Sequence, residues 1–86
     1  MDDAQIQSRI EKLEAEERRL RSDEERSAHH GDSERIEADR DRLAAIKVEL
    51  DQQWDLLRQR RALRNAGSDP DQARVRDGGT VENYLG

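Results

Sequence analysis

The 86-residue sequence contains no cysteine, no phenylalanine and only one proline. Without cysteine the chain has neither disulfide bonds nor thiolate ligands for zinc, a composition that fits the reducing cytoplasm. No hydrophobic run approaches the roughly 20 apolar residues that span a bilayer, and the acidic beginning of the sequence does not resemble a signal peptide. We therefore expect a cytoplasmic protein that does not insert into a membrane.

Apolar side chains are scarce as well, since 31% of the residues are hydrophobic whereas 43% are charged. A chain of this length and composition forms one domain at most and has few side chains with which to fill a core. The residues that dominate are strong helix formers, chiefly alanine, leucine, glutamate, arginine and glutamine. The composition predicts an all-α fold built from long, solvated helices.

The first segment has apolar residues at helical spacing, which form one narrow stripe of the coiled-coil kind. The stripe consists of Ile6, Ile10, Leu13 and Leu20. Asp2 is placed to cap this helix with Gln5 as its reciprocal partner, although Asp3 could serve instead. The stripe fades before Gly31, which can adopt the left-handed conformation that ends a helix. We predict a helix over about residues 3–28.

A second stripe predicts a longer helix over about residues 33–66. Its apolar positions are Ile36, Leu43, Ile46, Leu50, Trp54 and Leu57. Because the connection between the two helices is short, they should run antiparallel, with facing residues whose numbers sum to about 61. The second helix should extend beyond the start of the first. Residues 1–66 are thus predicted to form an antiparallel two-helix coiled-coil hairpin.

The end of the second helix is basic, with four arginines in residues 54–66 against Asp55 alone. Cations at this position favour the negative end of the helix dipole, which is a sufficient structural explanation for them. The basic region is too small for a nucleic-acid site, and the acidic remainder of the chain would repel both phosphate and anionic lipid. We expect neither nucleic acid nor a membrane as a partner.

One narrow apolar stripe gives a small domain little stability, so the hairpin is expected to need a partner. Leu56, Ala62 and Leu63 are predicted to lie off the stripe or beyond its end. Dimerisation into a four-helix bundle is the simplest solution, and folding on another protein is the alternative. The expected interface consists of Trp54, Leu56, Leu57, Arg60, Arg61, Leu63, Tyr84 and Leu85.

Residues 67–86 form a C-terminal tail of different composition, which we expect to be largely irregular. Gly67 is a plausible helix C-cap, the Asp69–Pro70 pair should begin a turn or a short helix, and Gly78–Gly79 reads as a hinge. Val81, Tyr84 and Leu85 would share one face if the end of the chain is helical. The tail therefore either binds to the hairpin or to a second subunit, or is a frayed terminus.

Residues capable of chemistry are few. His29 and His30 are adjacent in the predicted turn, where they offer a weak metal site at best. The acidic residues lack an apolar pocket that would raise the pKa of one of them, and neither a phosphate-binding glycine loop nor aromatic stacking positions are present. We expect a non-enzymatic protein without a cofactor, a metal or a small-molecule substrate.

Three segments carry a resemblance to a known family. They run from Leu50 to Leu63, from Gly67 to Arg76 and from Val81 to Leu85. Together they resemble domain of unknown function family 2630, a family of small uncharacterised actinobacterial proteins. The resemblance implies no known activity. It does imply that the tail and the hairpin form one unit in which Asp69, Pro70, Val81 and Tyr84 have a structural role.

Two functional hypotheses follow. The first is a protein interaction or structural module that self-associates through the long second helix and its surface from Trp54 to Leu63. The second is a regulatory coiled-coil finger that acts on a larger complex through an acidic tip, and this hypothesis rests on analogy of fold. The tip would comprise Asp23 to Glu25 together with Asp32 and Glu34.

Overall fold

A computed structural model describes residues 1–31 and 33–85, with the side chains of these ranges except those of 27–30 and 82–85. The chain forms helix α1 (Asp3–His30), helix α2 (Ser33–Asn65), a short 3-10 helix η1 (Pro70–Gln72) and helix α3 (Gly78–Leu85). The described residues contain no β-strand. The prediction of an all-helical chain with two long helices and a short tail is confirmed.

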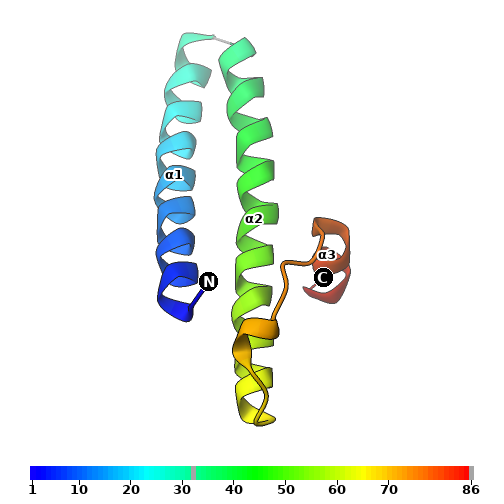
Figure 1. The fold of residues 1–86 in the computed structure, drawn as a ribbon. Helices are drawn as coiled ribbons and strands as arrows, with labels where there is room; N and C mark the ends of the chain where they lie inside the picture. Colours follow the sequence, from blue (N-terminus) through cyan, green and yellow to red (C-terminus); the bar gives the residue numbers. More distant parts are fainter. Residues whose placement is uncertain (32, 86) are drawn as a thin grey trace.

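Helices α1 and α2 lie side by side and run in opposite directions, and α2 extends beyond the start of α1 (Figure 1). The molecule is elongated, with principal dimensions of 55 × 25 × 15 Å. Ion pairs cross between the helices, among them Arg9–Glu49 at 2.7 Å and Arg42–Glu16 at 2.6 Å. The numbers of both pairs sum to 58, three below the predicted sum of about 61.

The contact between α1 and α2 is a thin apolar core, made of Ile6, Ile10, Leu13 and Ile46 with Leu56 beside them. Two expectations about this core are wrong. Trp54, expected on the stripe, is 52% exposed, whereas Leu56, expected off it, is 5% exposed and belongs to the cluster of Ile6 and Ile10. The reason is that α2 is covered on a second side by the tail, so its buried side faces both neighbours rather than α1 alone.

The helix ends have the predicted caps. The Asp2 amide donates to Oε1 of Gln5 at 2.9 Å and the Gln5 amide donates to Oδ1 of Asp2 at 2.8 Å, which is a reciprocal capping box. Gly31 has a φ of 71° and Gly67 a φ of 74°. Beyond Gly67 the Ser68 amide donates to the Leu63 carbonyl at 2.8 Å, a Schellman arrangement that ends α2.

The tail turns back along α2, and α3 lies against α2 on the side away from α1 (Figure 1). Asp69 caps η1 by accepting from the Asp71 amide, as the Asp69–Pro70 pair predicted. The expectation of an irregular tail with a hinge at Gly78–Gly79 is wrong for its last part, because both glycines begin α3. Asp77 explains this helix, since its carboxylate accepts from the Thr80 amide at 2.9 Å and acts as an N-cap.

Gly78 lies close against α2. A Cβ atom at this position would lie 2.6 Å from Cγ1 of Val48, so only a glycine fits here without displacement. Val81, one turn further along α3, is 1% exposed.

None of the helices, over the residues described, combines the length and the apolar character that crossing a bilayer requires.

Candidate interaction surface

Trp54 lies between two shallow depressions, and we call the residues around it the Trp54 surface. The first depression has a volume of about 350 Å³ and is lined by Asp3, Gln7, Trp54, Leu57, Arg58, Arg61 and Arg64. The second has a volume of about 310 Å³ and is lined by Gln7, Ile10, Glu11, Glu14 and Trp54. Both depressions lie over α1 and α2 together. An exposed indole ring in the middle of a surface made by two rigid helices is a suitable anchor for a protein partner.

The Trp54 surface is basic on the side toward the end of α2. Arg64 donates to Asp3 at 3.0 Å and Arg58 donates to Asp55 at 2.9 Å, so these two guanidinium groups are oriented by carboxylates. Arg61 is exposed and makes no hydrogen bond or ion pair with the described residues. Its charge is therefore available to a partner.

Two residues of the expected interface are buried within the chain. Leu56 belongs to the core, and Arg60 is 7% exposed. The Arg60 guanidinium donates to Asp3 at 2.5 Å and to Asp71 at 2.9 Å, and these hydrogen bonds lower the pKa of both carboxyl groups below their usual value. Arg60 thus connects the start of α1 to the tail instead of facing solvent.

The other expected interface residues fall into three groups. Trp54 and Arg61 are exposed, and Leu57 and Leu63 are half-buried. The side chains of Tyr84 and Leu85 lie outside the described residues. A role in an interface stays a prediction for all six.

Asp55 is the polar residue that the sequence interpretation missed. Its carboxylate is 1% exposed and accepts two hydrogen bonds from Arg76, at 2.9 and 2.7 Å, and one each from Arg58 and Gln59. Burial raises the pKa of Asp55, but the hydrogen bonds from Arg76, Gln59 and Arg58 outweigh it, so the pKa lies below its usual value. Asp55 remains ionised and ties the tail to α2.

Two glutamines of α2 complete this contact with the tail backbone. Gln59 donates to the Arg74 carbonyl at 2.7 Å and accepts from the Arg74 amide at 3.2 Å, and Gln52 donates to the Arg76 carbonyl at 3.0 Å. Together with Asp55 they form what we call the tail anchor. Its signal in the sequence is a polar stripe at positions 52, 55 and 59, whose helical spacing matches that of an apolar stripe.

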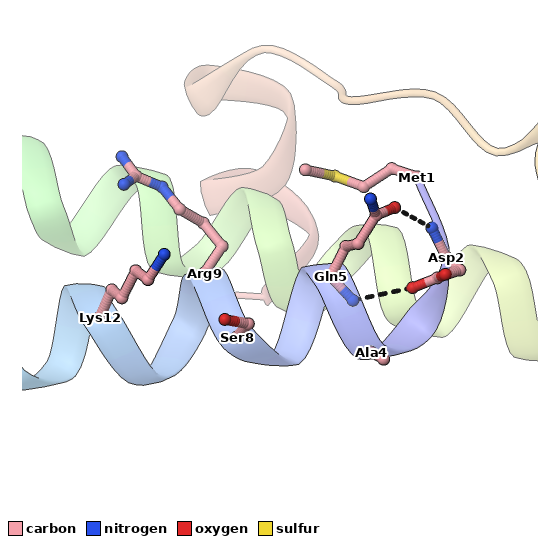
Figure 2. Close-up of a pocket in the computed structure, with 7 residues that line it drawn as sticks. All are labelled: Met1, Asp2, Ala4, Gln5, Ser8, Arg9 and Lys12. Atoms are coloured by element: carbon pink, nitrogen blue, oxygen red, sulfur yellow. Dashed lines mark hydrogen bonds between the residues drawn. The ribbon is translucent and has the colours of Figure 1, made fainter.

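A further depression lies at the beginning of α1, and its seven lining residues are exposed. Figure 2 shows that they come from the two residues before this helix and from its first turns, and that the two hydrogen bonds of the capping box lie at one end. The volume is about 470 Å³, and the lining residues are Met1, Asp2, Ala4, Gln5, Ser8, Arg9 and Lys12. Arg9 is paired with Glu49. The depression holds no buried polar group that would orient a ligand.

Within the described ranges, no three histidine, aspartate or glutamate side chains are grouped as metal ligands would be. The predicted weak site at His29 and His30 falls on side chains outside those ranges.

The comparisons with known proteins agree on a family. Residues 2–86 match the family described as protein of unknown function (DUF2630). The chain is 48% identical over 84 residues to uncharacterized protein Rv0898c of Mycobacterium tuberculosis and to uncharacterized protein Mb0922c of Mycobacterium bovis, and each match covers 98% of this chain and 91% of the relative. No solved structure matches the chain. The resemblance found in the sequence is thereby confirmed, and the chain belongs to the DUF2630 family.

Proposed function

We propose that this chain is a non-enzymatic interaction module, an antiparallel helical hairpin that self-associates through α2 and the Trp54 surface. The observation that carries the proposal is the 52% exposure of Trp54 on a rigid helix. Tryptophan buries about 150–250 Å² when it is covered, and it is enriched among the residues that dominate the energy of protein interfaces. In the isolated chain the apolar surface of this ring faces water, and a partner that covered it would gain the free energy of burying that surface.

The small core supports the same proposal. Among the side chains that the structure describes, the buried hydrophobic residues are Ile6, Ile10, Leu13, Ile46, Leu56 and Val81. A core of this size rarely contributes more than about 3–5 kcal/mol, and small domains commonly add oligomerisation to reach a stable state. Two copies packed through α2 would form a four-helix bundle, in which the Trp54 surface is covered by the second copy.

Self-association is tested by mass and by fluorescence on the same samples. Trp54 is the only tryptophan, so its emission reports on this surface alone. We expect light scattering after size exclusion to give the mass of a dimer that falls toward the monomer on dilution. The emission of Trp54 should shift to longer wavelength over the same range, because the indole becomes exposed to water.

The matched variants are Trp54→Ser and Val75→Ser, since Val75 is 57% exposed but lies on the tail. Trp54→Ser should give a helical monomer, and Val75→Ser should keep the mass of the wild-type chain. Leu56 is unsuitable for this test because it belongs to the core. A wild-type chain that is monomeric at every concentration, or a Trp54→Ser variant with unchanged dimer mass, contradicts the proposal.

The regulatory finger is a second proposal with less support. At the proposed tip, Asp23 pairs with Arg26 at 2.7 Å and Glu24 pairs with Arg40 at 3.2 Å, so two of its carboxylates are already neutralised. Glu25 and Glu34 are exposed. Reversing the charge of these two residues should abolish capture of a cationic partner without changing stability, and retained capture would refute the finger.

A further inference from the structure

Charge is distributed unevenly along the molecule. Residues 22–41, which include the end of α1 and the beginning of α2, contain eight acidic and three basic residues. The rest of the chain contains 13 residues of each sign, so the net charge of −5 belongs entirely to this segment. We call it the acidic end.

The carboxylates of the acidic end face solvent to a large extent. Its three arginines are engaged nearby: Arg26 and Arg40 pair with carboxylates of α1, and Arg35 lies 3.9 Å from Asp23. Other carboxylates are exposed and make no hydrogen bond or ion pair with the described side chains, namely those of Glu25, Glu34, Glu37 and Asp41. The electrostatic potential around the acidic end is therefore negative.

The Trp54 surface lies toward the opposite end of α2, where Arg58, Arg61 and Arg64 line one of the two depressions beside the indole ring. Arg61 is exposed and has no partner among the described residues. The molecule thus carries a negative region at one end of a 55 Å body and, toward the other, a partly apolar region with three arginines on the side nearest the end of α2.

Charge decides between the two ways in which copies of such a body align. The Debye length at physiological ionic strength is about 8 Å, so charges repel only when they lie close together. A parallel alignment brings two acidic ends into contact. An antiparallel alignment separates them by much of the molecular length and directs each acidic end toward the arginines of the other copy.

We propose that the second copy docks on the exposed face of α2 in antiparallel orientation, so that the acidic end of each copy lies alongside the Trp54 surface of the other. This inference rests on the proposed self-association and adds its geometry. The arrangement is two-fold and closed, because each copy offers the same two regions to its partner. It predicts a dimer that does not grow further.

Pulsed electron paramagnetic resonance distinguishes the two alignments. The chain has no cysteine, so a single introduced cysteine carries one spin label. Ala38→Cys labels the acidic end and Ala62→Cys labels the opposite end, and both alanines are exposed. The two positions are 24 residues apart in the sequence, which corresponds to about 36 Å of helix at roughly 1.5 Å per residue.

In the antiparallel dimer, two Ala62→Cys labels should lie about 36 Å apart, by the same helical rise. A mixture of chains labelled at Ala38→Cys and at Ala62→Cys should add a distance shorter than about half of that value. The mass of each labelled protein is measured first. If the label at Ala62→Cys prevents association, Asn65→Cys replaces it, since Asn65 is also exposed.

The failures are distinguishable. A monomer at every concentration overturns the self-association and this geometry together. A dimer with a short distance between identical labels, and a long one in the mixture, overturns the antiparallel geometry and leaves self-association standing. A mass that grows beyond the dimer also overturns the closed two-fold arrangement.

Discussion

Helix α2 is contacted on one side by α1 and on another by the tail, and the two contacts are made of different groups. Toward α1 most of the buried residues are aliphatic, as Ile46 illustrates, and Arg60, which donates to Asp3, is the buried exception. Other ion pairs lie at the exposed margin, as between Arg9 and Glu49. Toward the tail the most buried residue of α2 is a carboxylate, Asp55, and glutamine side chains bind the backbone of the tail. The α1 contact thus depends mainly on apolar burial, whereas the tail contact adds directed hydrogen bonds to the burial of Val81 and the close packing of Gly78 on Val48.

The difference follows from the backbone of each partner. In α1 the backbone groups are paired within the helix, so only side chains are left to make contact. The segment between η1 and α3 is extended and has no neighbouring strand, so its amide and carbonyl groups need partners elsewhere. The side-chain amide of Gln59 donates to the Arg74 carbonyl and accepts from the Arg74 amide, and these two hydrogen bonds stand in for those that a neighbouring strand would make.

The largest effect is expected from removing an apolar group on the α1 side. Ile46→Ala should lower the free energy of unfolding by about 2–5 kcal/mol, because it deletes buried methyl groups and leaves a cavity. Val75→Ala is the control, since Val75 is exposed, and it should change stability by less than about 0.5 kcal/mol. Urea unfolding followed by circular dichroism measures both. Equal losses for the two variants would contradict an apolar basis for the α1 contact.

On the tail side, Asp55→Ala should cost about 2–3 kcal/mol, because Arg76 and Arg58 lose the carboxylate that orients them. The matched control is Asp51→Ala, one turn earlier on α2 and half-buried. Amide hydrogen exchange should show that Asp55→Ala exposes the tail while α1 keeps its protection. If both regions lose protection equally, the tail is not held separately by Asp55.

How far the sequence predicts this structure depends on which of the two contacts is considered. The helices, the capping box of Asp2 and Gln5 and the cap at Gly67 follow from spacing and local chemistry, because these depend on residues near in sequence. The role of Asp55 does not, since a charged residue beside a stripe normally indicates a solvated face. Its partner Arg76 is 21 residues away, and only the fold brings the two together. The expectations about Trp54 and Leu56 were wrong for the same reason, because the sequence does not show that the tail covers a second side of α2.

A smaller effect is expected from Gly78→Ala, which tests how closely α3 packs on α2. The new methyl group would overlap Val48, whose branched side chain has little freedom to move, so the tail contact should weaken by about 1–2 kcal/mol. Gly79→Ala is the control, because its methyl group would meet only a carboxylate oxygen of Asp77, at 3.3 Å. Hydrogen exchange of α3 measures the difference. Greater loss in Gly79→Ala than in Gly78→Ala would argue against close packing at Val48.

Lowering the pH below about 4 should weaken the tail contact, whereas the contact should be unaffected near neutral pH. The pKa of Asp55 in the folded chain lies below the ordinary value of 3.8, so its ionised form is bound more strongly than in the unfolded chain. The stability that it contributes is complete above about pH 4 and is lost as the pH falls through the folded pKa. Urea unfolding of the wild-type chain and of Asp55→Asn should therefore converge as the pH is lowered from 7 to below 3. A constant difference between them would show that the charge of Asp55 is not what binds the tail.

The smallest effect is expected for the ion pair between Arg9 and Glu49, and it completes the comparison of the two sides of α2. Both side chains are substantially exposed, at 44% and 33%, so water and salt screen their attraction. Exposed pairs of this kind contribute about 0–1 kcal/mol. A double-mutant cycle of Arg9→Ala and Glu49→Ala should give a coupling energy in that range, which falls further as salt is added. The equivalent cycle for Asp55 and Arg76 should give a larger coupling energy that resists salt, because the carboxylate is buried. If the two couplings are equal, the ion pairs on both sides of α2 act alike, and the tail must owe its position to Val81 and Gly78 instead.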